Sequence, residues 1–191
     1  MQEIAIMIDF FDYVDEELSD EVFYIRDEQN QTKVKLIKDR LDATKENCVR
    51  VLNDLRKSIK FIPVDSNIPL KKLDGQDESR CDAFLFEPER ATFIEIKDVR
   101  NSQNHKAKEQ LKNTIRLFDE YHSNMKVRRQ AYLCDLNRYV TFYSEVDENG
   151  YEEKMQRYLS KVSTKEDKET FLLEYKTRFY VGNDVKFNDG Y

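Results

Sequence analysis

The sequence predicts a single α/β domain, and three consecutive segments carry that prediction. Residues 80–97 contain two apolar stretches around a short polar turn, which is typical of a β-hairpin. Residues 103–122 have apolar side chains at helical spacing, and Gln130–Leu136 has the composition of a short buried strand. A strand, a helix and a further strand in this order favour a crossover that brings the two strands together in parallel.

Length and charge limit the classes of protein that fit. The chain has 191 residues, enough for one domain with a buried core, and its 4 glycines and 3 prolines favour long regular elements. The net charge is −6, whereas a protein held to nucleic acid by bulk electrostatics is usually basic. A contact with DNA or RNA is therefore expected to use a local basic patch or a metal ion.

The first residues lack the basic segment and cleavage site of a secretory signal, and no apolar stretch approaches membrane-spanning length. The number of cysteines is odd, and the spacing of Cys48, Cys81 and Cys134 matches no zinc site. These features predict a cytoplasmic protein with reduced thiols and no membrane contact. We expect Cys81 and Cys134 to be small buried side chains on strands.

The N-terminal part is predicted to hold a helix within residues 1–20, where acidic and aromatic side chains are concentrated. Val22–Arg26 and Lys33–Lys38 are predicted strands on either side of a polar turn. Residues 41–58 fit a helix, and Val49–Asn53 within them also fits a strand, because the apolar spacing is compatible with both.

Phe61–Val64 is a predicted strand, and Ile68–Gln76 is a predicted loop. In the C-terminal part, Tyr151–Ser160 is a predicted helix. Phe179–Val181 and Val185–Phe187 are predicted to form a second hairpin around a two-residue turn.

The first hairpin places chemically active side chains together. If Glu87 pairs with Arg90 at the turn, then Asp82 lies opposite Glu95, and Lys97 projects from the same face. Two carboxylates at that separation repel unless one is protonated or a cation lies between them. The set is therefore suited to holding a divalent metal ion and activating a water molecule.

A simpler interpretation is an exposed hairpin face on which Arg80 and Lys97 offset the charges of the two acids. Such surface ion pairs contribute little to stability. The acid-x-Lys pattern is not diagnostic by itself, because the sequence contains four more such triplets. These begin at Glu152, Glu166, Glu174 and Asp184. The order of the surrounding elements distinguishes the triplet at Glu95.

In this context the chain resembles the PD-(D/E)XK nuclease superfamily, whose restriction-endonuclease-like core runs helix, three-stranded meander, helix, strand. Asp82 matches the first acid of the motif, Glu95 the second, and Lys97 the lysine. Gln110 matches a glutamine that some branches carry on the following helix, and Cys81 stands where the name motif has proline. The resemblance covers residues 44–136 and leaves residues 1–43 and 137–191 as peripheral additions.

The resemblance implies hydrolysis of phosphodiester bonds in DNA or RNA with Mg²⁺ or Mn²⁺. Asp82, Glu95 and the backbone carbonyl of Ile96 would supply the metal ligands. Lys97 would orient water or stabilise charge, and Gln110 would hold Lys97 or contact the substrate backbone. The acid that many members carry on the first helix has three candidates here. They are Glu46, Asp74 and Asp77.

Lys108, Lys112 and Arg116 recur every fourth residue and form a basic stripe on the predicted helix. Such a stripe could contact phosphates, and it equally fits an ordinary solvated helix face. His105 and His122 are expected on the surface and not as ligands.

The alternative function is a catalytically inactive nuclease-like fold that acts as a protein-binding or immunity-type module, since an acidic chain suits a basic protein partner. The oligomeric state is left open by the sequence.

Overall fold

The computed structural model describes residues 8–27, 34–39, 48–65, 67–71, 75–97, 104–135, 156 and 159–187. Its largest element is a six-stranded mixed sheet with strand order β1-β5-β6-β7-β8-β9. The strands are antiparallel from β1 to β7 and parallel from β7 to β9. Their bounds are β1 Glu16–Leu18, β5 Ile59–Pro63, β6 Ala83–Glu87, β7 Arg90–Lys97, β8 Arg128–Asp135 and β9 Thr177–Val181.

A second sheet of four strands has the order β10-β4-β2-β3. The strand β10 runs parallel to β4, and the other pairs are antiparallel. The bounds are β2 Val22–Arg26, β3 Lys35–Ile37, β4 Cys48–Leu52 and β10 Asp184–Lys186.

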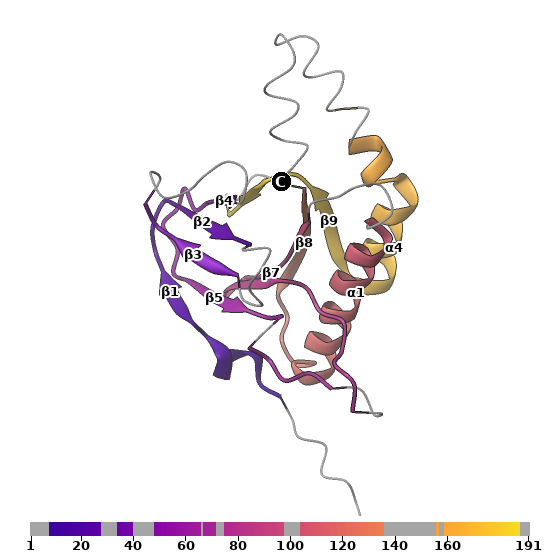
Figure 1. Cartoon of the computed structure of the whole chain (residues 1–191), viewed down its shortest axis with the longest axis horizontal. Coiled ribbons are helices and arrows are strands. Elements are labelled where there is room, and N and C mark those ends of the chain that lie inside the picture. The colour runs from indigo at the N-terminus through magenta and orange to yellow at the C-terminus, as the bar shows by residue number, and fades with distance from the viewer. Residues whose placement is uncertain are drawn as a thin grey trace, which may run out of the picture.

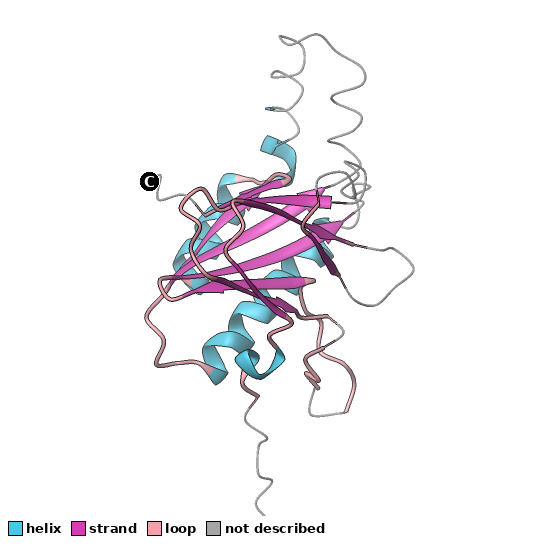
Figure 2. Ribbon diagram, turned by 90° about the vertical axis from the view of Figure 1, so that its left-hand side faces the viewer, coloured by secondary structure: helices cyan, strands magenta, loops and turns pink. Residues whose placement is uncertain are grey.

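The six-stranded sheet lies between the second sheet and the helices. The helices are α1 (Asn104–Tyr121) and α4 (Lys165–Tyr175), with a short 3-10 helix η1 (Phe10–Tyr13) near the N-terminus. Figure 1 shows α1 and α4 together on one side of β7, β8 and β9, with β2, β3 and β4 on the other side. In Figure 2, turned by 90°, helical segments lie behind and below the strands.

Two apolar clusters fill the spaces between these layers. One joins alternate side chains of the six-stranded sheet, such as Phe84 and Phe93, to α1 residues such as Phe118. The other joins the intervening side chains, such as Ile94, to the second sheet. Because both faces are covered, seven of the eight residues of β7 are buried.

The structure confirms the predicted α/β class and the central hairpin. Glu87 pairs with Arg90, and Phe84 pairs with Phe93, as the turn predicted. The predicted helix after the hairpin is α1, and the strand after it is β8, which runs parallel to β7. The crossover is therefore present.

At the ends of the chain, the predicted N-terminal helix is present among the described residues only as the short η1, and the predicted C-terminal hairpin is wrong. Within residues 1–20, the described part forms η1 and then β1. The strand β1 pairs with β5 at the edge of the six-stranded sheet, and this pairing buries Leu18. The predicted second hairpin is divided between sheets, since β9 pairs with β8 while β10 pairs with β4.

For the ambiguous segment 41–58, Cys48–Leu52 is a strand, so the helical alternative is wrong for these five residues. Most of the predicted helix Tyr151–Ser160 lies outside the described residues. No helix in the described part of the chain is long and apolar enough to cross a membrane.

Candidate functional site

Asp82, Glu95 and Lys97 meet at one end of the six-stranded sheet. Asp82 directly precedes β6, and Glu95 and Lys97 lie in the last three residues of β7. Successive side chains of a strand point to opposite faces of the sheet. Asp82 lies two residues from Phe84, and Glu95 and Lys97 lie two and four residues from Phe93, so all three project from the face that α1 covers. The Nζ of Lys97 lies 2.7 Å from Oε1 of Glu95.

The backbone N–H of Ile96 donates to Oδ2 of Asp82 over 2.6 Å. In an extended strand the N–H and C=O of one residue point to the same neighbouring strand. The carbonyl of Ile96 therefore also faces the start of β6, where Asp82 lies. This agrees with the backbone ligand that the resemblance implied.

The two acids are buried, which makes the exposed ion-pair interpretation wrong. Glu95 is fully buried, Asp82 is 7% exposed, and the Lys97 side chain is 25% exposed. Oε2 of Glu95 has no hydrogen-bond partner among the described residues. A buried carboxylate oxygen without a donor is costly, so the site favours a further polar or cationic ligand.

Burial dominates the electrostatics of the two carboxyl groups. It raises the pKa of Asp82 to about 7, against the opposing effects of Lys97 and of the Ile96 N–H. Burial also raises the pKa of Glu95, and the charge of Asp82 raises it further. Burial alone would lower the pKa of Lys97, but Glu95 and Asp82 more than offset this, and the net shift is upward.

Two further acids lie near enough to influence this site. Asp27 directly follows β2 in the second sheet; burial raises its pKa, Lys97 lowers it, and Asp65 raises it. Asp27 and Asp65 both raise the pKa of Asp82. Neither acid was predicted as part of the site: each directly follows a predicted strand, but that position does not show which strand ends meet in the fold.

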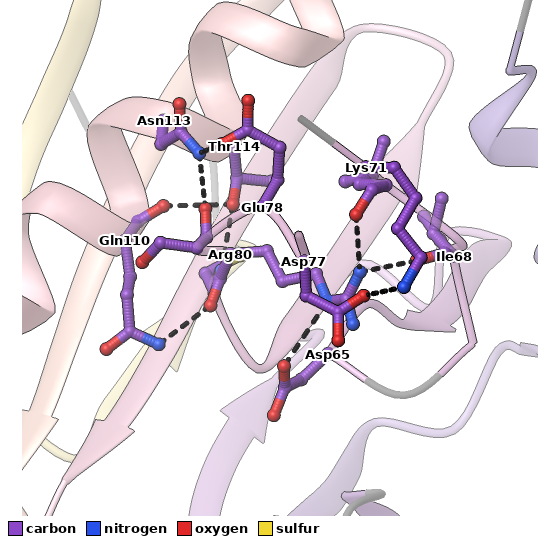
Figure 3. A network of polar contacts seen from close by, with 12 residues as sticks. Asp65, Ile68, Lys71, Asp77, Glu78, Arg80, Gln110, Asn113 and Thr114 are labelled. Carbon is purple, nitrogen blue, oxygen red and sulfur yellow. Dashed lines mark hydrogen bonds and ion pairs between the residues drawn. The ribbon is translucent and has the colours of Figure 1, made fainter. Parts of the chain in front are cut away.

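The candidates for an additional acid are not brought to the site by the described structure. Asp77 forms an ion pair with Lys71 on the loop before β6 (Figure 3). Glu46 and Asp74 lie outside the described residues.

Gln110 lies beside the site but contacts a different group from the one expected. Its Nε2 donates to the backbone carbonyl of Arg80 over 2.8 Å, and Gln110 is 8% exposed. Its Oε1 has no hydrogen-bond partner among the described residues. The amide therefore contacts the chain just before Asp82.

Each residue of the basic stripe has an acidic neighbour. Lys108 pairs with Asp167 of α4 at 2.6 Å, and Lys112 pairs with Glu109 at 2.9 Å. Arg116 pairs with two acids, Glu78 and Glu120. The stripe remains a predicted phosphate contact, and its positive charge is largely balanced in the free protein.

The donor set at the site suits a hard divalent cation. Mg²⁺ prefers oxygen ligands, keeps several waters and is commonly held by one or two carboxylates. Asp82, Glu95 and the Ile96 carbonyl fit that pattern, and the unpartnered Oε2 of Glu95 is a free ligand atom. Within the described ranges, no three Asp, Glu, His or Cys side chains form a metal cage. Water and substrate would supply the other ligands.

The cysteines and histidines lie outside this set. Cys81 and Cys134 are fully buried, as expected, and burial raises the pKa of both thiols. His105 is exposed, as expected, whereas the His122 side chain is only 9% exposed. The Nε2 of His122 accepts a hydrogen bond from the Phe10 N–H over 3.2 Å, because η1 packs its aromatic rings against the end of α1.

Comparisons of the chain with protein-family models, with curated proteins and with solved structures found no match.

Proposed function

We propose that this protein is a metal-dependent nuclease that hydrolyses phosphodiester bonds of DNA or RNA. The observation that carries the proposal is the buried set of Asp82, Glu95 and Lys97 on one face of one hairpin. The succession β5, β6, β7, α1, β8 supports it, because it follows the order of the last five core elements in the nuclease superfamily that the chain resembles.

Asp82, Glu95 and the Ile96 carbonyl would hold Mg²⁺ or Mn²⁺. When bound, such an ion stabilises charge on a phosphate and lowers the pKa of a coordinated water. A cation bound there would offset the burial and the repulsion by Asp82 that together raise the pKa of Glu95.

Lys97 supplies the positive group that belongs to the chain itself. Its upward pKa shift keeps the ammonium protonated at neutral pH. Because the side chain is partly exposed, its Nζ can donate both to Glu95 and to a water or phosphate oxygen. We assign Lys97 the role of orienting the attacking water or stabilising charge on the phosphate.

The site is tested by incubating plasmid, single-stranded DNA and RNA with the protein and Mg²⁺ or Mn²⁺. We expect Glu95→Gln to reduce cleavage by about 100-fold or more, since several kcal/mol of charge stabilisation depends on the ion. The matched control is Glu89→Gln, which changes an exposed acid on the turn of the same hairpin. It should cleave like the unmodified protein.

Calorimetry with Mn²⁺ completes the test. Cleavage that persists in Glu95→Gln, or a protein that binds no Mn²⁺, contradicts the proposal. A stable complex with a basic protein, together with the absence of metal binding, would favour the inactive protein-binding module.

A further inference from the structure

The segment immediately before Asp82 precedes the first paired residue of β6, Ala83. The last pairs of β6 are Pro63 with Ala83 on one side and Ala83 with Ile94 on the other. Residues 79–81 therefore have no strand partner for their backbone groups among the described residues. Cys81 is fully buried, so its N–H requires another acceptor.

Three side chains of α1 provide these partners, as Figure 3 shows. The amide of Asn113 donates to the Ser79 carbonyl, and the amide of Gln110 donates to the Arg80 carbonyl. The Cys81 N–H donates to Oγ1 of Thr114 over 2.8 Å. We call Gln110, Asn113 and Thr114 the α1 clamp.

The spacing of the α1 clamp explains why one helix can hold an extended segment. Residues separated by three and four positions lie on the same helix face, so Gln110, Asn113 and Thr114 form one continuous edge. Thr114 is itself oriented, because its hydroxyl donates to the carbonyl of Gln110 over 2.9 Å. The clamp substitutes for a neighbouring strand over three consecutive residues.

The segment is also anchored from the opposite side. Nη1 of Arg80 donates to the carbonyl of Ile68 over 2.8 Å, and its Nε pairs with Asp65. Both the backbone and the side chain of Arg80 are thus engaged (Figure 3).

The clamped segment leads directly into Asp82. The carbonyl of Asp82 accepts from the Val64 N–H over 2.9 Å, and its carboxylate accepts from the Ile96 N–H. With Cys81 fixed by Thr114, the backbone of Asp82 is held on both sides.

We propose that Gln110, Asn113 and Thr114 are positioning residues that set the carboxylate of Asp82 for metal binding. This inference rests on the proposed nuclease function. It gives Gln110 a role different from the catalytic one implied by the resemblance, because the Gln110 amide acts through the chain before Asp82 and not on Lys97 or substrate.

The test compares Thr114→Val with Thr114→Ser. Valine keeps the shape of threonine but removes the acceptor for the Cys81 N–H, whereas serine keeps the hydroxyl. The matched control is Thr92→Val, since Thr92 is equally buried and its hydroxyl has no hydrogen-bond partner among the described residues. Asn113→Ala weakens the clamp at a half-buried position, should Thr114→Val fail to fold.

Two readouts separate positioning from general stability. The first is the amide signal of Ile96 in NMR spectra of the metal-free protein, which reports the bond to Asp82. We expect Thr114→Val and Asn113→Ala to shift this signal and speed its hydrogen exchange, while Thr114→Ser and Thr92→Val leave it unchanged. The second is Mn²⁺ affinity by calorimetry, which should fall 10–100-fold in Thr114→Val and recover in Thr114→Ser.

The outcomes distinguish this inference from the proposed function. If the unmodified protein binds Mn²⁺ and neither clamp variant changes the Ile96 signal or the affinity, the positioning role is overturned and the nuclease proposal stands. If the unmodified protein binds no Mn²⁺, the nuclease proposal fails. In that case the Ile96 signal alone supports or overturns the positioning of Asp82.

Discussion

Asp82 and Glu95 show how position within one site separates two similar carboxyl groups. Asp82 accepts a backbone N–H and lies at the start of a strand, whereas Glu95 lies within the sheet with one oxygen unpartnered among the described residues. Burial raises the pKa of both. Burial therefore works against the charged form of both acids, and a bound divalent cation would favour that form.

A pH dependence of stability follows for Asp82. Well below pH 3.8 its carboxyl is protonated in the folded and unfolded chains and has no effect. Between the unfolded value of 3.8 and the folded value of about 7, only the unfolded chain ionises. The contribution of Asp82 to the free energy of unfolding should then fall as pH rises, by about 1.4 kcal/mol per pH unit.

Urea denaturation of the metal-free protein and of Asp82→Asn from pH 4 to pH 8 measures this effect. Asparagine keeps an acceptor for the Ile96 N–H but cannot ionise, so the difference between the two proteins isolates Asp82. The variant should become the more stable protein as the pH approaches 7. Parallel pH profiles would contradict the assignment.

At the scale of elements, α4 illustrates how local sequence fixes both ends of a helix. Thr164 and Asp167 form a reciprocal capping box at its start, and Asp167 also pairs with Lys108 of α1. At its end, Lys176 adopts a left-handed backbone with φ of 52°, a conformation that glycine adopts without steric cost. The cap thus contains strain that a substitution can relieve.

We expect Lys176→Gly to stabilise the protein by about 0.5–1 kcal/mol, because relief of the left-handed conformation outweighs the greater freedom of the unfolded chain. Lys176→Ala is the control, because alanine keeps the backbone strain. Like glycine, it loses the bond from the Lys176 ammonium to the Leu173 carbonyl. Thermal denaturation measures both. A glycine variant no more stable than the alanine variant would show that the strain has no net effect.

At the scale of the whole molecule, a buried arginine connects the central hairpin to the second sheet. Arg90 and Glu87 are each 2% exposed and form an ion pair at the turn of the hairpin. The Arg90 guanidinium also donates to the Lys186 carbonyl and lies over the ring of Phe187. One side chain therefore joins the two layers near the end of the hairpin opposite the candidate site.

Replacing Arg90 should affect the whole fold. We expect Arg90→Met to lower the free energy of unfolding by about 3 kcal/mol, because within the described ranges it leaves buried Glu87 with Lys57 as its remaining cation. Adding Glu87→Gln should recover part of that loss by removing the buried charge. Urea denaturation of the single and double variants checks this, and a single variant within 0.5 kcal/mol of the unmodified protein would exclude it.

The part of the site that could be predicted from the sequence is the part that a single hairpin determines. The register of the hairpin follows from its short turn, so the meeting of Asp82 and Glu95 could be anticipated. Asp27 could not be placed in this way, because only the packing of the second sheet brings it near Lys97. Periodicity likewise indicated that α1 is a helix but not that Thr114 would hold Cys81.

The second hairpin was mispredicted for the same reason. Gly182 and Asn183 suit a two-residue turn, but longer-range pairing separates the strands on either side of them. The Arg50 N–H donates to the carbonyl of Asn183, and the Gly182 N–H donates to the carbonyl of Leu133. These contacts connect positions far apart in sequence, and no local pattern reveals them.

The position of β10 has a consequence for synthesis of the protein. Val185 pairs with Val51, so β4 lacks one of its two neighbours until a strand made more than a hundred residues later has left the ribosome. The residues that build the hairpin and α1 are translated well before that point. The hairpin that carries Asp82, Glu95 and Lys97 is therefore translated before the second sheet, in which Asp27 directly follows β2, can gain its last strand.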